Sequence, residues 1–188
     1  MKAREGPPAT YEDLLKVPDI FIAEIIDGEL IQSPRPGARH ATGATGMLTQ
    51  ICGAFHGPTR PGAPGGWWIL FEPELHLHGD VVVPDAAGWR HERMPVIPDV
   101  AYFELPPDWV CEIFSPRREE IDRVRKMPIY GREGIGHLWL VDPVERTLEV
   151  YGLEGGRWVV LGTHAGDERV RAAPFATVEL DLSRWWIP

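Results

Sequence analysis

Short apolar runs alternate with polar residues along most of the chain, and 19 prolines and 20 glycines divide them into short elements. Runs of period two, rich in β-branched and aromatic residues, predict strands. The dipeptide Asp27-Gly28 between two such runs is typical of a hairpin turn. The predicted strands cover residues 21–32 (as a hairpin), 68–78, 81–89, 109–114, 137–141, 147–153, 157–162 and 177–182.

Three segments have helical features. A capping box that begins at Thr10 predicts a short helix through about Lys16. Residues 39–55 place their apolar side chains on one face, which is typical of an amphipathic helix. A polar helix is expected from Arg117 to about Tyr130, although Pro128 should kink or break it. The order of elements predicts one α+β domain over residues 1–188, with a core at about 10–153 and further strands in 157–188.

Composition indicates an ordinary soluble protein, with 44% hydrophobic and 25% charged residues. Residues 1–10 have no apolar run of a signal peptide, and no segment approaches the roughly 20 apolar residues of a membrane span. Cys52 and Cys111 have no zinc-type spacing and are read as reduced thiols. We therefore expect a cytoplasmic protein without membrane contact.

The formal net charge of −9 argues against tight nucleic-acid binding by the whole surface, because cationic side chains supply most of that affinity. It remains compatible with a carboxylate site whose charge a metal ion cancels. The few basic residues that could contact a phosphate backbone are Arg90, Arg93, Arg117, Arg118, Arg123 and Arg125. Spacing alone leaves open that these form an ordinary solvated face.

Glu112 is the first candidate for chemistry, because it lies inside the apolar run Trp109–Phe114. On a strand it shares a face with Val110 and Phe114. An unpaired buried carboxylate costs several kcal/mol, so Glu112 should meet a cation, a basic group or a proton. The alternative is a Glu that faces solvent from a half-exposed strand.

Asp85 is the second candidate, because it ends the apolar run Val81–Val83 after Pro84. Pro-Asp is also a common turn, so Asp85 is a candidate site residue only if it pairs with Glu112 from a neighbouring strand. Two such carboxylates could hold Mg²⁺ or Mn²⁺, which activates water and stabilises phosphoryl charge.

Lys126 shares a helical stripe with Asp122 and Tyr130, at spacing i, i+4 and i+8. Ile121, Val124 and Ile129 suggest a buried flank, so Lys126 could point toward the preceding strand. The alternative is an exposed Asp122–Lys126 pair of little energetic consequence.

Two N-terminal residues could join the site. Glu24 is a further carboxylate among apolar residues. His40 opens a predicted helix, where the helix dipole favours a neutral imidazole that can act as ligand or base. The alternative for His40 is a solvated residue of the first turn.

Several short motifs occur together in a fixed order. They are Glu-Ile-Ile-Asp-Gly-Glu-Leu (24–30), Ser-Pro (33–34), His40, Val-Val-Pro-Asp (82–85), Glu-Ile-Phe-Ser-Pro (112–116), Asp122-Arg123, Lys126, Tyr130 and Leu-Trp-Leu-Val-Asp-Pro (138–143). Over residues 10–153 this set resembles the Uma-two family of putative restriction endonucleases, within the PD-(D/E)XK nuclease superfamily.

The resemblance implies a restriction-endonuclease-like core, with a central mixed β-sheet flanked by helices, and a metal-dependent DNA endonuclease. Asp85 and Glu112 would match its acidic residues, with Mg²⁺ or Mn²⁺ as cofactor and DNA as substrate. The superfamily lysine usually lies two residues after the second acid, where this chain has Phe114. The family instead takes it from the following helix, at Lys126. Glu24 and His40 would match an additional acid and the helix-opening histidine.

A second reading is a nuclease-fold protein that has lost catalysis and serves as a binding module, for example in a homodimer. The acidic charge, Pro128 and exposed Trp pairs at 67–68 and 185–186 favour it. A hydrolase of another class has no support, since the chain contains neither a Gly-rich phosphate loop nor a G-x-S-x-G motif.

Overall fold

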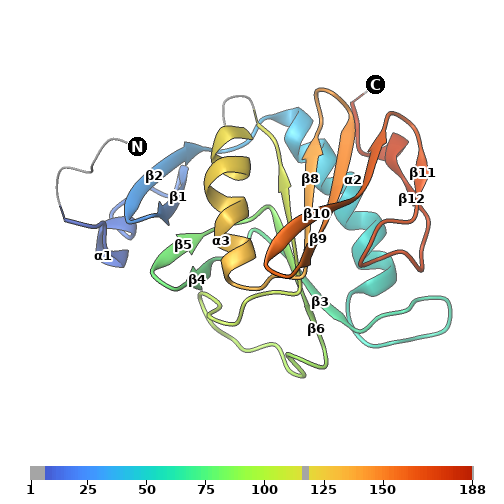
Figure 1. Ribbon diagram of the computed structural model, residues 1–188, viewed down its shortest axis with the longest axis horizontal. Coiled ribbons are helices and arrows are strands. Elements are labelled where there is room, and N and C mark those ends of the chain that lie inside the picture. Colours follow the sequence, from blue (N-terminus) through green and yellow to red (C-terminus); the bar gives the residue numbers. More distant parts are fainter. Residues whose placement is uncertain (1–6, 116–118, 188) are drawn as a thin grey trace.

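A six-stranded mixed sheet forms the centre of the computed structural model, which describes residues 7–115 and 119–187 (Figure 1). Its strand order is β10-β9-β8-β7-β6-β3. Among these strands β7 and β8 pair in parallel, because a helix connects them, and the other pairs are antiparallel. The strands are β3 (Trp67–Phe71), β6 (Ala86–Arg90), β7 (Trp109–Ile113), β8 (His137–Asp142), β9 (Thr147–Glu154) and β10 (Arg157–Ala165).

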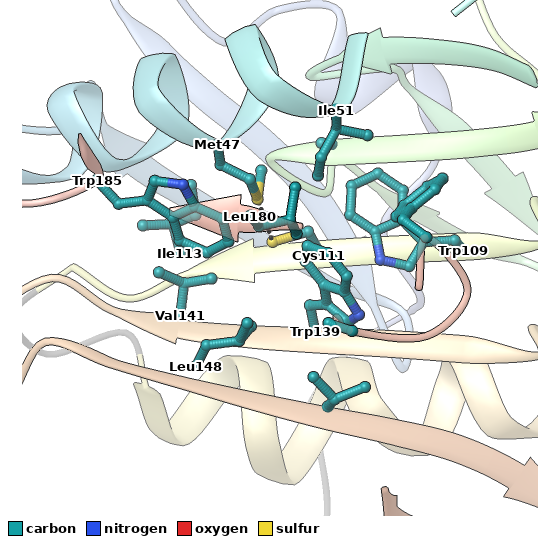
Figure 2. Packing of buried hydrophobic residues seen from close by; sticks show 14 of the residues in the cluster. Met47, Ile51, Trp109, Cys111, Ile113, Trp139, Val141, Leu148, Leu180 and Trp185 are labelled. Atoms are coloured by element: carbon teal, nitrogen blue, oxygen red, sulfur yellow. Dashed lines mark hydrogen bonds between the residues drawn. The ribbon is translucent and has the colours of Figure 1, made fainter. Parts of the chain in front are cut away.

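Helices cover both faces of this sheet, as the predicted fold class required. Along β7 the side chains of Trp109, Cys111 and Ile113 face helix α2 (Ala38–Phe55), where Met47 and Ile51 meet them (Figure 2). The alternate residues face helix α3 (Met127–Arg132) on the opposite side. Glu112 therefore lies on the α3 face of the central sheet.

A second, four-stranded sheet packs beside α3, with strand order β2-β1-β5-β4. Its strands are β1 (Phe21–Ile26), β2 (Glu29–Pro34), β4 (Leu75–Leu77) and β5 (Asp80–Val82), and the short helix α1 (Tyr11–Leu14) precedes them. The predicted hairpin is confirmed, and both turn residues, Asp27 and Gly28, have positive φ. The capping box between Thr10 and Asp13 is confirmed as well.

Two predicted strands, the first of which Pro73 was expected to interrupt, are each divided between the two sheets. Residues 68–78 divide into β3 and β4, and residues 81–89 divide into β5 and β6, with one half of each in a different sheet. Pro73 and Pro84 lie at the two crossovers, where their missing N–H groups end the ladders. The backbone N–H of Glu72 donates to the Asp85 carbonyl at 3.2 Å, so the crossovers lie side by side.

Pro128 does not break the third helix, but the helix is distorted in the turn before it. Residues Ile121–Lys126 form a π-helical segment that continues into α3, and Pro128 lies in the first turn of α3, where a missing N–H costs least. The wider turn, closed by the Met127 N–H to the Asp122 carbonyl, accommodates the proline. The predicted start of this helix at Arg117 lies outside the described residues.

The C-terminal residues pack beside α2 and complete the core between this helix and the central sheet (Figure 2). The expected strand at 177–182 is shorter, as β12 (Leu180–Asp181) pairs with β11 (Arg169–Val170) and the 3₁₀ turn η2 (Leu182–Arg184) follows. The expectation of exposed Trp pairs was wrong, because Trp67, Trp185 and Trp186 are buried in the core around Phe175. None of the helices in the described ranges has the length and hydrophobicity of a membrane span.

Candidate active site

Asp85 and Glu112 meet at the point where the chain crosses from one sheet to the other. Ala86 pairs with Cys111 in the antiparallel ladder of β6 and β7, so Asp85 and Glu112 are opposed one residue further along. The Ile113 N–H donates to Asp85 Oδ2 at 2.6 Å and fixes that carboxylate against β7. The two acids are therefore neighbours, as the sequence predicted, and Glu112 is buried rather than facing solvent.

Lys126 reaches this pair from the π-helical segment. Its ammonium lies 2.8 Å from Glu112 Oε1 and 2.8 Å from Glu24 Oε1, and it donates to the Val83 carbonyl at 3.2 Å. Its side chain is only 1% exposed. The alternative of an exposed pair with Asp122 is wrong, since both groups are buried and 4.0 Å apart.

The stripe of Asp122, Lys126 and Tyr130 all faces inward. The Tyr130 hydroxyl donates a hydrogen bond to Glu112 Oε1. The sequence placed Tyr130 on this stripe but not among the predicted site residues. Val124, expected in the buried flank, is 64% exposed. The π-helical turn changes the angular spacing of this segment and turns Val124 outward.

Glu24 joins the site from β1, and its side chain is fully buried. Glu24 Oε1 accepts the Val83 N–H at 2.9 Å as well as the Lys126 ammonium. It thereby ties the lysine to the backbone two residues before Asp85. Glu24, the additional acid that the resemblance implied, therefore holds Lys126 in place.

His40 contacts Asp85 from the first turn of α2, with Nε2 2.8 Å from Asp85 Oδ1. The histidine is buried, so the alternative of a solvated first-turn residue is wrong. Its Nδ1 is also buried and has no hydrogen-bond partner among the described residues. Asp85 is thus fixed on both oxygens, by His40 and by the β7 backbone.

Negative charge exceeds positive charge in this cluster. Burial, together with Asp122, Asp85 and Glu24, raises the pKa of Glu112 well above its usual value, against the opposing effect of Lys126. Burial alone would lower the pKa of Lys126, but the surrounding carboxylates outweigh it and raise that pKa. The surrounding carboxylates thus raise the pKa of both groups.

Several polar side chains share one small cavity. Asp85, Glu112, Asp122, His40 and Lys126 line a cavity of about 20 Å³, room for about one water molecule or ion. Within residues 7–115 and 119–187 no group of three or more His, Cys, Asp or Glu is arranged to hold a metal. A cation here would take oxygens from two carboxylates and complete its shell with water, as Mg²⁺ commonly does.

The basic residues that were expected to face a phosphate backbone are largely engaged in other contacts. Arg123 pairs with Glu119 and Glu149. Arg125 pairs with Glu29 at 2.8 Å, and Arg93 pairs with Asp108 at 3.2 Å. The Arg90 guanidinium lies over the Trp67 ring, 4.6 Å from its centroid. Arg117 and Arg118 lie outside the described residues.

Comparison with known proteins identifies the family of this chain. The family model Uma2, described as "Putative restriction endonuclease", matches residues 8–183. The chain belongs to the Uma2 family. A solved structure, a putative nuclease belonging to DUF820 from Anabaena variabilis, is similar over 95% of this chain and 97% of its own, with 24% identity and a TM-score of 0.74. This likeness shows that the fold is shared. No curated protein matches the sequence.

Proposed function

We propose that this Uma2 protein is a metal-dependent endonuclease that hydrolyses phosphodiester bonds in DNA, with Asp85 and Glu112 as the ligands of one Mg²⁺ or Mn²⁺ ion. The observation that carries the proposal is that two carboxylates on neighbouring strands and one buried ammonium line the same ion-sized cavity. Family membership supports a nuclease, and two neighbouring carboxylates that line one cavity support a metal ion as its cofactor.

The charge balance supports a cation. Three described carboxylates, Glu24, Glu112 and Asp122, lie around the ammonium of Lys126, and Asp85 adds a fourth negative charge near Glu112. Such a surplus of like charge is costly in a buried site, because the low dielectric strengthens repulsion. A divalent cation between Asp85 and Glu112 would cancel it.

Each described residue then has a distinct task. A bound Mg²⁺ or Mn²⁺ would supply Lewis-acid activation of water and of the phosphoryl group. His40 and the Ile113 N–H hold the two oxygens of Asp85 in a fixed orientation. Lys126 places a positive charge at the cavity wall, where it can orient the attacking water and stabilise charge on the phosphate in the transition state.

The alternative of a non-catalytic binding module rested on three features, and two of them are absent from the described structure. Pro128 leaves the helix intact, and three of the four Trp residues of the expected surface pairs are buried. The acidic net charge remains.

A cleavage assay tests the proposal. Plasmid and single-stranded DNA are incubated with the protein in Mg²⁺ or Mn²⁺, beside Asp85→Asn and Glu112→Gln. Each variant should lose about 100-fold or more of the rate, because each removes transition-state charge stabilisation. Asp167→Asn, a change in an exposed carboxylate, serves as control and should keep full activity. Cleavage that survives in both site variants would come from a contaminant and would contradict the proposal.

A further inference from the structure

A hollow of about 260 Å³ adjoins the carboxylate cavity along helix α2. Pro36 and His40 line both spaces, so the hollow opens directly beside Asp85. Its volume is close to the lower limit of about 300 Å³ for pockets that take small organic molecules. A ligand bound in the carboxylate cavity could therefore extend a planar group into this hollow.

The wall of this hollow is apolar and aromatic. Ala41, Ala44, Leu48 and Phe71 contribute to it, and none of its described lining residues carries a carboxylate. The Phe71 side chain at the end of β3 is 55% exposed, which is unusual for a large aromatic residue beside a polar site. An exposed aromatic face is a stacking platform for a nucleobase.

His40 adds a polar group to the same wall. Its Nε2 is engaged by Asp85, whereas its buried Nδ1 has no partner among the described residues.

A second hollow of about 500 Å³ continues from the first along the outer face of α2. The two hollows share Ala41 and Thr45, and Arg184 forms part of the second. Helix α2 contains Arg39 and no Asp or Glu over its 18 residues, although the chain as a whole has a net charge of −9. The outer face of α2 is therefore a surface that an anionic backbone can approach.

We infer that these two hollows form a binding track for a single nucleic-acid strand, in which an unpaired base stacks on Phe71 and the backbone runs past Arg184. The base must be unpaired, because both faces of a base in a duplex are covered by its neighbours. Glu72, next to Phe71, does not oppose the strand, since Arg35 neutralises it at 3.3 Å. The inference rests on the proposed function, because it assigns the strand that the carboxylate site would cut.

Binding without catalysis provides the test. The anisotropy of a fluorescein-labelled single-stranded oligonucleotide is measured with the full chain in EDTA, so that no cleavage occurs. Phe71→Ala should raise Kd about 5- to 100-fold, the range for loss of one stacked base, and Phe71→Tyr should keep it unchanged. Arg184→Gln should raise Kd and lower the salt slope by about 0.7, as expected for one lost phosphate contact on a single strand.

Arg157→Gln is the matched control, because Arg157 is an exposed arginine on the edge strand β10, and it should leave Kd unchanged. The inference is overturned if wild-type protein shows no binding, if a duplex of the same sequence binds more tightly, or if Phe71→Ala binds like wild type. If the wild-type protein binds the strand through Phe71 but does not cleave DNA, the proposed hydrolysis is overturned and the binding track remains. If the protein cleaves DNA and Phe71→Ala changes neither cleavage nor binding, the track is overturned and the proposed hydrolysis remains.

Discussion

The Lys126 ammonium lies 2.8 Å from the Glu112 carboxylate although one residue belongs to a helix and the other to a strand. The strand position two residues after Glu112 is Phe114, whose buried ring lies under the Arg123 guanidinium at 4.9 Å. The lysine beside Glu112 thus comes from the following helix and not from the strand itself. This contact makes Lys126 a structural residue as well as the proposed catalytic one.

Replacement of Lys126 by Met should destabilise the protein by about 3–5 kcal/mol, because it leaves buried carboxylates without their cation. Addition of Glu24→Gln should recover part of this loss. Urea unfolding measures both, with the exposed Lys16→Met as a control that should change stability by less than about 0.5 kcal/mol. A Lys126→Met protein as stable as the control would show that the cluster is not held by this ammonium.

Tyr130→Phe removes the hydroxyl that donates to Glu112 and leaves the aromatic ring in place. The expected cost is about 1–3 kcal/mol, because a buried acceptor loses a partner, together with a lower kcat, since Glu112 loses its fixed orientation. Tyr151→Phe is the matched control, because that hydroxyl bonds to Glu149 away from the cavity, and kcat should not change. Equal effects on kcat in both variants would remove Tyr130 from the site.

Local chemistry predicted most elements of the fold. The Asp27-Gly28 turn, the capping box at Thr10 and the apolar face of residues 39–55 are short-range signals, and each element formed as expected. Crossovers between sheets are decided by tertiary pairing. An apolar run such as 81–89 reads the same whether it stays in one sheet or changes to another, and only the proline at its centre hints at the change.

The site residues that the sequence predicted are those whose burial could be inferred from their apolar neighbours. A carboxylate inside an apolar strand, as at Glu112 and Glu24, indicated a buried partner, and Lys126 is that partner. Tyr130 was not assigned to the site, because a tyrosine on a helix stripe looks like any core aromatic. The π-helical segment that aims Lys126 has no sequence signature beyond Pro128, so the direction of Val124 was mispredicted.

Two glycines of helix α2 test how the C-terminal residues pack on it. A Cβ at Gly46 would lie 2.2 Å from the Arg184 carbonyl oxygen, whereas a Cβ at Gly53 meets no atom within 4 Å. Gly46→Ala should therefore destabilise by about 1–3 kcal/mol through overpacking. Gly53→Ala should stabilise by up to about 1 kcal/mol, because alanine is the better helix former. Thermal unfolding that ranks the two in the opposite order would contradict this packing.

The Arg123–Glu149 pair should make stability depend on pH in one direction. The Arg123 hydrogen bond lowers the pKa of Glu149 below its ordinary value of 4.5. The contribution of the pair is therefore complete above 4.5 and is lost as the pH falls through the lower pKa of the folded state. Glu149→Gln should cost about 1 kcal/mol near neutral pH, and the difference from wild type should shrink below pH 4.5. If the stability difference between wild type and Glu149→Gln grows as the pH falls, the predicted pH dependence is wrong.

A structure of the protein crystallised with Mn²⁺, with anomalous diffraction recorded, tests the central claim most directly. The account predicts one anomalous peak in the cavity, within about 2.5 Å of an oxygen from each of Asp85 and Glu112. Lys126 should remain beside Glu24, and Asp85→Asn should remove the peak. A cavity without a peak at millimolar Mn²⁺, with Lys126 and Tyr130 still bound to Glu112, would contradict the assignment of a metal to this site.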